Sequence, residues 1–258
     1  MFLLTYSYNS VQSAGFLNEE KSGIIPASEV LQGASNIDMI DIIKIFNNFN
    51  LKELKNTINT YKDAISLNEV KVLSPIPFPK RNIICLGKNY LDHISEVKSL
   101  KNVNSDIPQK PIYFSKIAYP AIGHEDVVNS HSNLVKQLDY EVELAIIIGK
   151  KCKNVSMEEA EDIIFGYTIA NDISARDIQT THGQWHKGKS FDTFCPIGPY
   201  IVHKSSISFP PKLKIQSYVN NELRQNGNTD NLIFDIPYII SDLSSGITLY
   251  PGDIILTG

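Results

Sequence analysis

The run LDYEVELAIIIGK at residues 138–150 constrains the fold more than any other part of the sequence. Apolar side chains alternate along it with a second series, which is the two-residue period of a β-strand. Glu141 and Glu143 belong to that second series and lie about 6.6 Å apart along the strand. Ala145 and Ile147 continue the same series. We therefore expect the face that carries both carboxylates to be at least partly buried.

The bulk properties exclude several classes of protein. The chain has 258 residues, 42% of them hydrophobic and 20% charged, which is ordinary globular composition. A formal net charge of −4 leaves no excess of cations for nucleic acid. The amino terminus lacks the features of a secretory signal, and no run reaches the roughly 20 apolar residues of a membrane span. Three cysteines without metal-ligand spacing fit a reducing compartment, so we expect a cytoplasmic protein without membrane contact.

A proline-rich segment divides the chain. Residues 74–80 hold Pro75, Pro77 and Pro79, and each proline removes a backbone donor and disfavours helix before it. We predict a linker there, between a small N-terminal α/β domain at 1–73 and a catalytic domain at 81–258. Strand patterns dominate the second part, including a hairpin that turns at Asn220 and Asn221. The predicted fold class is β-rich α+β.

Asp172 offers a third carboxylate. It ends the apolar run FGYTIAND, just before a predicted helix near Ser174, and strand ends that face loops are common places for sites. Three carboxylates without His or Cys beside them give hard oxygen ligands, which suit Mg²⁺, Mn²⁺ or Ca²⁺ better than zinc. From the residues alone two interpretations stay open: a cation site, or the solvated face of an amphipathic strand.

Four motifs in order resemble the fumarylacetoacetate hydrolase family. They are GKNYLDHISE, LDYEVELAIIIG, NDISARDIQ and GQWHKGKSFDTFCPIGP, and the similarity covers about residues 80 to 258. The resemblance implies a mixed β-sandwich roll, a homodimer, and one Mg²⁺ or Mn²⁺ ion in each active site. It implies a small 2-oxo acid as the substrate.

The resemblance also assigns roles to acidic and histidine side chains. By position, Glu141, Glu143 and Asp172 match the family's metal ligands. His93 and Glu96 match a pair in which the histidine, supported by the glutamate, activates water or moves a proton. Without the resemblance, His93 and Glu96 would be interpreted as an incidental pair on an exposed helix turn.

Further residues match groups that contact the substrate. Lys189 matches a lysine whose ammonium stabilises charge that develops on the substrate. Arg176 and Gln179 match substrate contacts, and Lys116 is a weaker candidate for binding the substrate carboxylate. An ion pair of Arg176 with Asp177 is the alternative for that arginine. Trp185 is expected to be a large apolar anchor.

The resemblance leaves the reaction open. We predict hydrolysis of a carbon–carbon bond in acylpyruvates such as fumarylpyruvate or acetylpyruvate. The alternatives are oxaloacetate decarboxylation, keto–enol tautomerisation, or isomerisation of 2-hydroxyhepta-2,4-diene-1,7-dioate. A catalytically silent binding protein on the same fold is the second alternative. Relatives continue past the motif LTG with T-P-x-G and several strands, so we expect the gene product to extend beyond Gly258.

Overall fold

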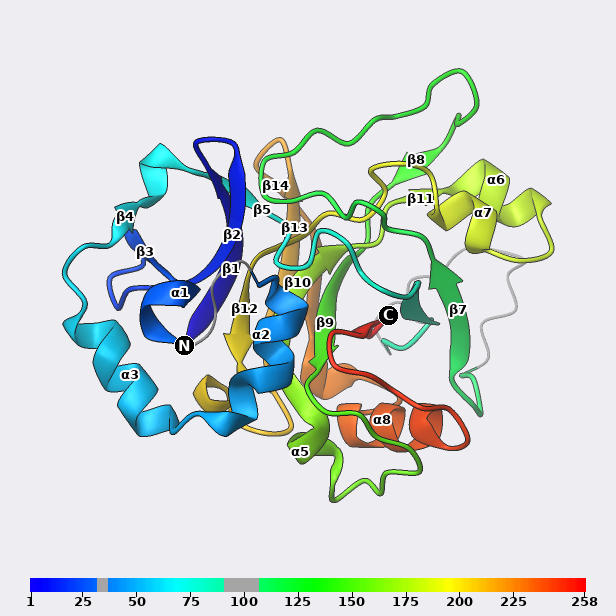
Figure 1. Ribbon diagram of the computed structural model, residues 1–258. Helices are drawn as coiled ribbons and strands as arrows, with labels where there is room; N and C mark the ends of the chain where they lie inside the picture. Colours follow the sequence, from blue (N-terminus) through cyan, green and yellow to red (C-terminus); the bar gives the residue numbers. More distant parts are fainter. Residues whose placement is uncertain (32–36, 91–106) are drawn as a thin grey trace.

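A mixed β-sheet organises the protein. The computed structural model describes residues 1–31, 37–90 and 107–258, and eleven strands within them form one sheet (Figure 1). In spatial order the strands are β4 (Ile65–Ser66), β3 (Gly23–Pro26), β2 (Val11–Leu17), β1 (Phe2–Tyr8), β12 (Ile197–His203), β10 (Ile164–Asn171), β9 (Val142–Ile148), β15 (Ile254–Leu256), β6 (Ile83–Gly87) and β7 (Ile112–Lys116), with β5 (Lys71–Leu73) beside β1. β15 runs parallel to β6. The predicted β-rich α+β class is confirmed.

Two short strand pairs lie outside this sheet. They are β8 (Leu138–Asp139) with β11 (Ser174–Ala175), and the hairpin of β13 (Lys214–Val219) with β14 (Glu222–Asn228). The predicted hairpin turn is confirmed, because Asn220 and Asn221 have φ of 50° and 64°. Asparagine tolerates this left-handed conformation, which two-residue hairpin loops favour.

Helices are short and lie around the sheet. The α-helices are α1 (Ala27–Val30), α2 (Met39–Ile45), α3 (Leu51–Thr60), α5 (Ala160–Ile163), α6 (Arg176–Thr181), α7 (His186–Lys189) and α8 (Ile236–Ser244). The 3₁₀ turns are η1 (Phe46–Asn48), η2 (Leu67–Glu69), η3 (Lys204–Ser206) and η4 (Thr229–Asn231). Among the described residues, no helix is both long and apolar enough to cross a bilayer.

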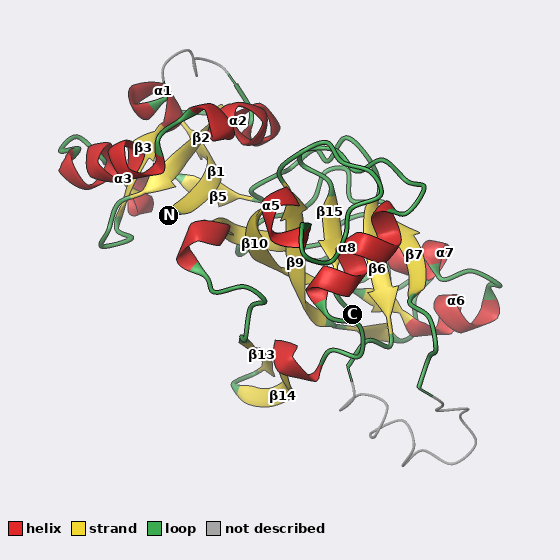
Figure 2. Cartoon of the chain, turned by 90° about the horizontal axis from the view of Figure 1, so that it is seen from below, coloured by secondary structure: helices red, strands yellow, loops and turns green. Residues whose placement is uncertain are grey.

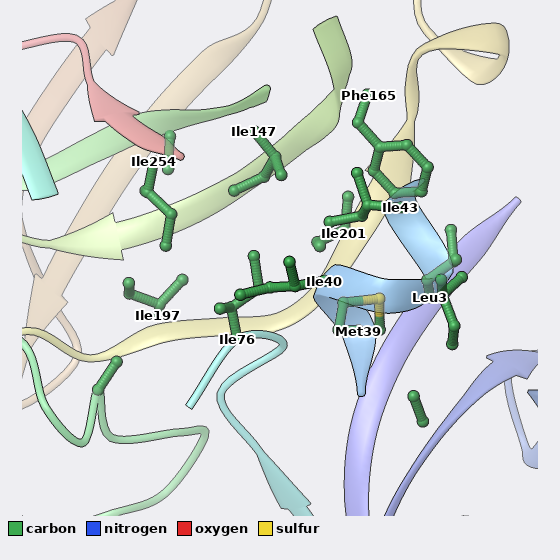
Figure 3. Close-up of a cluster of buried hydrophobic side chains, with 14 of the residues drawn as sticks. Leu3, Met39, Ile40, Ile43, Ile76, Ile147, Phe165, Ile197, Ile201 and Ile254 are labelled. Carbon is green, nitrogen blue, oxygen red and sulfur yellow. The ribbon is translucent and has the colours of Figure 1, made fainter. Parts of the chain in front are cut away.

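One face of the sheet packs against α2. Asp38 caps this helix by accepting a hydrogen bond from the Asp41 N–H at 2.8 Å. Ile40 and Ile43 of the helix belong to the same buried cluster as Ile147 of β9 (Figure 3). Each such isoleucine contributes roughly 1.5–3 kcal/mol when fully buried. The helix therefore covers the face of β9 that also carries Glu143.

The other face packs against α8 (Figure 2). Asp235 caps α8 through the Tyr238 N–H at 2.9 Å, and Leu144 and Ile146 of β9 share a buried cluster with Ile240 of the helix. Both faces of β9 are thus covered. The interpretation of the Glu143 series as a solvated polar face is wrong, because Glu143, Ala145 and Ile147 are all buried.

The N-terminal strands continue the same sheet. β1 pairs with β12 through Phe2↔Val202 and Leu3↔Ile201, and α2 lies on the face that β9 and β12 share. Residues 1–73 therefore share both a sheet and an apolar core with the rest of the described chain. The division into two domains with a linker at 74–80 stays a prediction.

Cys85 of β6 lies in this core. The three cysteines are free thiols, and Cys85 is fully buried. Burial, followed by the negative charge of Asp172, raises the pKa of the Cys85 thiol well above its usual range. A thiol held in its protonated form is a poor nucleophile, so Cys85 serves as a small packing residue of this core.

His203 is a buried histidine at the end of β12. Its ring centroid lies 4.8 Å from that of Phe46 and 5.2 Å from that of Phe165, and its Nδ1 accepts a hydrogen bond from the Ser205 N–H at 3.2 Å. Burial, and then the positive charge of the amino terminus and of Lys204, lowers the pKa of His203 to about 4. The neutral ring is the form that fits this core.

Acid should therefore destabilise the fold through His203. Its pKa in the unfolded chain is about 6.5, so between about pH 6.5 and 4 the unfolded state binds more protons and stability falls as pH falls. The full effect is on the order of 3 kcal/mol. His203→Gln should flatten the pH dependence of the unfolding free energy in denaturant titrations. His124→Gln, at an exposed position, serves as the control, and equal pH profiles for the two variants would contradict this role.

Candidate metal centre and active site

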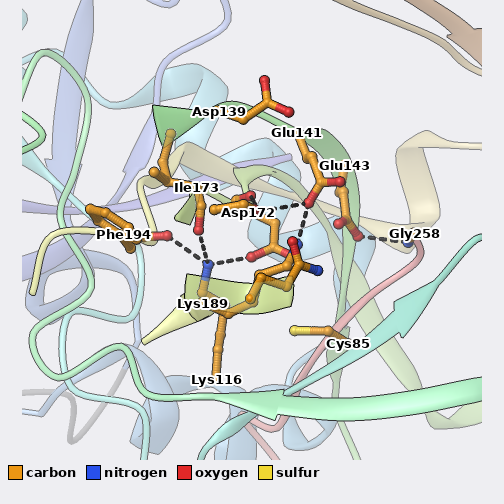
Figure 4. Close-up of polar contacts among 12 residues, drawn as sticks. Cys85, Lys116, Asp139, Glu141, Glu143, Asp172, Ile173, Lys189, Phe194 and Gly258 are labelled. Atoms are coloured by element: carbon orange, nitrogen blue, oxygen red, sulfur yellow. Dashed lines mark hydrogen bonds and ion pairs between the residues drawn. The ribbon is translucent and has the colours of Figure 1, made fainter. Parts of the chain in front are cut away.

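Two neighbouring strands bring the three predicted carboxylates together. Glu141 directly precedes β9, Glu143 is its second residue, and Asp172 directly follows β10. Glu143 is opposite Ala170 in the antiparallel pairing of these strands, and the Asp172 N–H donates to the Glu141 carbonyl at 2.8 Å. One oxygen from each carboxylate lies within 4.8 Å of the others (Figure 4). The predicted convergence is confirmed as geometry.

Lys189 bridges two of the three acids. It ends α7, is only 3% exposed, and donates from Nζ to Asp172 Oδ2 at 2.6 Å and to Glu141 Oε2. Burial disfavours the charged ammonium, but the negative charges of Asp172 and Glu141 outweigh it and raise the pKa of Lys189. The family resemblance predicts this lysine at the site, and here its charge is directed at the carboxylates.

Arg176 binds the Glu141 carboxylate oxygen that Lys189 does not contact. Its Nη2 donates to Glu141 Oε1 at 2.7 Å, its Nε to Asp139 Oδ2 at 2.8 Å, and its Nη1 to Gln179 Oε1 at 3.0 Å. Burial opposes ionisation of Glu141, but Lys189 and Arg176 outweigh it and lower the pKa of Glu141 to about 2. Glu141 is therefore ionised at neutral pH, in a fixed orientation.

Of the three acids, Glu143 has the fewest positive groups near it to offset its negative charge. It is buried and accepts a hydrogen bond from the Gly258 N–H at 2.6 Å, and it forms no ion pair with any described residue. Burial, then the charges of Asp172 and Glu141, raises the pKa of Glu143 well above its usual range. An additional cation would relieve this repulsion. The three hard oxygen ligands fit Mg²⁺ or Mn²⁺, and Ca²⁺ is also compatible.

Lys116 reaches the cluster from behind Asp172 and does not line the cavity. Lys116 is fully buried behind Asp172, where its Nζ donates to Asp172 Oδ1 and, at 2.6 Å, to the Phe194 carbonyl. A third donor direction is taken by the Ile173 carbonyl at 3.4 Å, so in this structure Lys116 acts as a counter-ion for Asp172. The predicted contact with a substrate carboxylate stays a prediction. His93 and Glu96 lie outside the described residues, and their pairing stays a prediction.

A cavity of about 360 Å³ opens onto the carboxylates. Its lining combines charged, amide and aromatic side chains, among them Glu141, Glu143, Arg176, Gln179, Lys189 and Trp185. Trp185, the expected apolar anchor, packs edge-on against Phe114 with ring centroids 5.3 Å apart. A Cβ on Gly87 would lie 2.4 Å from this indole, so the close approach of the ring requires glycine there. The cavity is wide enough for a small acid.

The β13–β14 hairpin contributes residues that the sequence did not reveal. Gln225 Oε1 accepts hydrogen bonds from the Val142 N–H and the Ser217 hydroxyl, each at 2.9 Å. Val142 lies between the two glutamates, so the hairpin docks directly beside the carboxylates. Arg224 and Tyr90 also line the cavity. The hairpin itself was predictable, but its docking site involves partners 83 residues apart.

The fold and the site together define a class of enzyme in which three carboxylates, of the kind that hold a divalent cation, face a cavity. Residues 82–258 match the family described as fumarylacetoacetate (FAA) hydrolase C-terminal. The chain belongs to the fumarylacetoacetate hydrolase family.

Named relatives refine this picture. The chain is 53% identical over 193 residues to the oxaloacetate tautomerase YisK of Bacillus subtilis (strain 168). That alignment covers 75% of this chain and 63% of YisK, so the chain matches less than two thirds of that relative's length. The relative's name agrees with the tautomerase alternative better than with acylpyruvate hydrolysis.

Solved structures support the fold. A fumarylacetoacetate hydrolase from psychrophilic Exiguobacterium antarcticum has a TM-score of 0.82 and 33% identity, covering 100% of this chain and 86% of that one. Maleylpyruvate hydrolase from Sphingobium sp. SYK-6, in complex with manganese (II) ion and pyruvate, has a TM-score of 0.77 and 29% identity, covering 100% and 88%. The fold expected from the family resemblance is confirmed.

Glu143→Gln should separate metal binding from folding. Glutamine keeps the acceptor for the Gly258 N–H but removes a crowded charge, so the metal-free variant should have a Tm equal to or above that of the wild-type chain. Mn²⁺ should raise the Tm of the wild-type chain and not that of the variant. Thermal unfolding with EDTA or with MnCl₂ measures both effects, and an equal Mn²⁺-induced rise in the two proteins would remove Glu143 from the metal site.

Proposed function

We propose that this chain is a divalent-metal-dependent oxaloacetate tautomerase, which interconverts the keto and enol forms of that 2-oxo acid. The convergence of Glu141, Glu143 and Asp172 beside a buried ammonium supports metal-assisted chemistry. The 53% identity to a protein named oxaloacetate tautomerase supports the choice of reaction. The cytoplasmic location and the homodimer expected from the sequence belong to the same proposal.

The proposed reaction moves one proton. The keto form loses a proton from C3 and gains one on the 2-oxo oxygen, and no carbon–carbon bond changes. A bound Mg²⁺ or Mn²⁺, held by the three acids, would polarise the 2-oxo group and acidify C3. Lys189, whose pKa is raised, stays charged and stabilises negative charge that develops on the substrate oxygen.

Other side chains hold the geometry in this proposal. Arg176 fixes Glu141 and, through Gln179, the wall of the cavity. Trp185 and Phe114 exclude water from one side, which strengthens each electrostatic contact inside. His93 and Glu96 remain the hypothesis for the proton acceptor at C3, on the family resemblance alone.

Acylpyruvate hydrolysis is the second candidate. It is supported by the likeness to maleylpyruvate hydrolase, at 29% identity. That reaction needs an attacking water in addition to the polarised 2-oxo group, whereas tautomerisation does not. Decarboxylation of oxaloacetate uses the same polarisation and differs in releasing CO₂. A catalytically silent protein would leave the cluster and the lysine without a chemical role.

A substrate panel tests the proposal. With Mn²⁺ or Mg²⁺, the wild-type chain should accelerate the decay of enol oxaloacetate absorbance, and EDTA should abolish the acceleration. Acetylpyruvate and fumarylpyruvate should yield no pyruvate, and oxaloacetate should release CO₂ no faster than in buffer with metal. Glu143→Gln is the matched inactive control. Pyruvate from an acylpyruvate, with no effect on the tautomer equilibration of oxaloacetate, would instead identify a hydrolase.

A further inference from the structure

Two neighbouring buried hydroxyls beside the carboxylates have no hydrogen-bond partner elsewhere in the described structure. They belong to Tyr90, which directly follows the Lys88–Asn89 turn after β6, and to Thr257, which follows β15. Most buried hydroxyls in proteins are paired, because an unpaired one has lost its hydration without compensation. Ser74 and Thr168 also carry unpaired buried hydroxyls, but neither lines the cavity. The position of Tyr90, and not the missing partner alone, therefore points to a ligand.

Tyr90 lines the cavity together with Glu141, Glu143 and Lys189. Its ring lies beside Gly227 of β14, 3.5 Å from where a Cβ of that glycine would be, and its backbone forms a β-bridge with Leu232. The side chain thus stands between the central sheet and the hairpin that docks on the carboxylates.

Asn89 fixes the backbone next to Tyr90. Its Nδ2 donates to the Thr257 carbonyl at 2.8 Å and to the Phe234 carbonyl at 3.1 Å, and its Oδ1 accepts from the Phe234 N–H at 2.8 Å. Asn89 is 1% exposed. These three bonds hold Tyr90 and Thr257 as neighbours, and Thr257 leads directly to the Gly258 N–H that binds Glu143. The phenol is therefore preorganised at the Glu143 side of the cavity.

The phenol is a donor at neutral pH. Burial raises the pKa of Tyr90 to about 12, the neighbouring Thr257 hydroxyl opposes the rise, and the negative charge of Glu143 adds to it. A protonated phenol can donate one hydrogen bond to an anionic oxygen, and such charge-assisted bonds are the stronger ones.

We propose that Tyr90 is a substrate-contacting residue: its hydroxyl donates a hydrogen bond to an oxygen of the 2-oxo acid bound in the cavity, and Thr257 orients the phenol. This inference rests on the proposed function, because it takes a small 2-oxo acid as the ligand. It assigns Tyr90 to the side of the cavity where Glu143 lies. The role of Tyr90 differs from that of the Lys189 ammonium. The contact supplies a neutral donor where Lys189 supplies a charge.

Tyr90→Phe tests the inference by ligand affinity. Oxalate, a planar dianion that resembles the enolate of a 2-oxo acid, is titrated calorimetrically into protein saturated with Mn²⁺. The variant should bind oxalate about tenfold more weakly, as expected for one lost hydrogen bond to a charged oxygen. Its Mn²⁺ affinity should be unchanged, because Tyr90 is not one of the three acids. Its Tm should stay near that of the wild-type chain, because the removed hydroxyl contacts only the neighbouring Thr257 hydroxyl in the described protein. Tyr167→Phe, at a buried tyrosine of β10 outside the cavity, should match the wild-type chain.

The outcomes separate this inference from the proposed function. If the wild-type chain binds oxalate and equilibrates oxaloacetate tautomers, equal oxalate affinity in Tyr90→Phe overturns only the role of Tyr90. A lowered Tm with unchanged affinity would also overturn it, since that marks a structural hydroxyl. If the wild-type chain neither binds oxalate nor acts on oxaloacetate, both proposals fall.

A second measurement does not depend on the variant. With 3-fluorotyrosine placed at position 90 alone, the ¹⁹F resonance should shift when oxalate is added to the protein loaded with diamagnetic Mg²⁺. The same label placed at position 167 should not respond. An unmoved resonance at position 90 under saturating oxalate contradicts the contact.

Discussion

Repulsion among three buried carboxylates is the interaction on which the rest of this site depends. Glu141 and Asp172 are compensated by Lys189, Arg176 and Lys116, whereas Glu143 has only a backbone N–H. A buried pair of charges is costly unless it is well matched, and an unmatched buried charge is more costly still. The arrangement therefore favours an additional cation at Glu143, and that cation is what we expect to activate the substrate.

The scaffold makes such crowding tolerable. β9 is covered by α2 on one face and by α8 on the other, so apolar burial on both sides anchors the strand whose first residues carry the glutamates. Burial also removes the water that would screen the acids. The packing that stabilises the sheet thus also strengthens the electrostatic interactions among the acids. On the cavity side, Gln225 of the β13–β14 hairpin accepts a hydrogen bond from the Val142 N–H, between the two glutamates.

Local patterns in the sequence predict local features well. The two-residue period of β9 places Glu141 and Glu143 on one face, and the Asn220–Asn221 pair predicts the hairpin turn. The end of the apolar run FGYTIAND indicates Asp172 as a third carboxylate, and the family resemblance adds Lys189, which periodicity alone cannot place beside it. Contacts between residues far apart in the sequence could not be predicted. Only the folded chain shows that Lys116 lies behind Asp172 and that Tyr90 packs beside the hairpin. Those contacts depend on how the strands are ordered in the sheet, which residue spacing does not encode.

The most direct test is the position of a bound cation. Crystals soaked in Mn²⁺ should show one anomalous difference peak, about 2.0 to 2.4 Å from oxygens of Glu141, Glu143 and Asp172, as expected for a small divalent ion with carboxylate ligands. Lys189 should then be displaced from at least one of the two carboxylates that it bridges. A peak at any other place, or no peak at saturating Mn²⁺, would contradict the claim that these three acids form a metal centre.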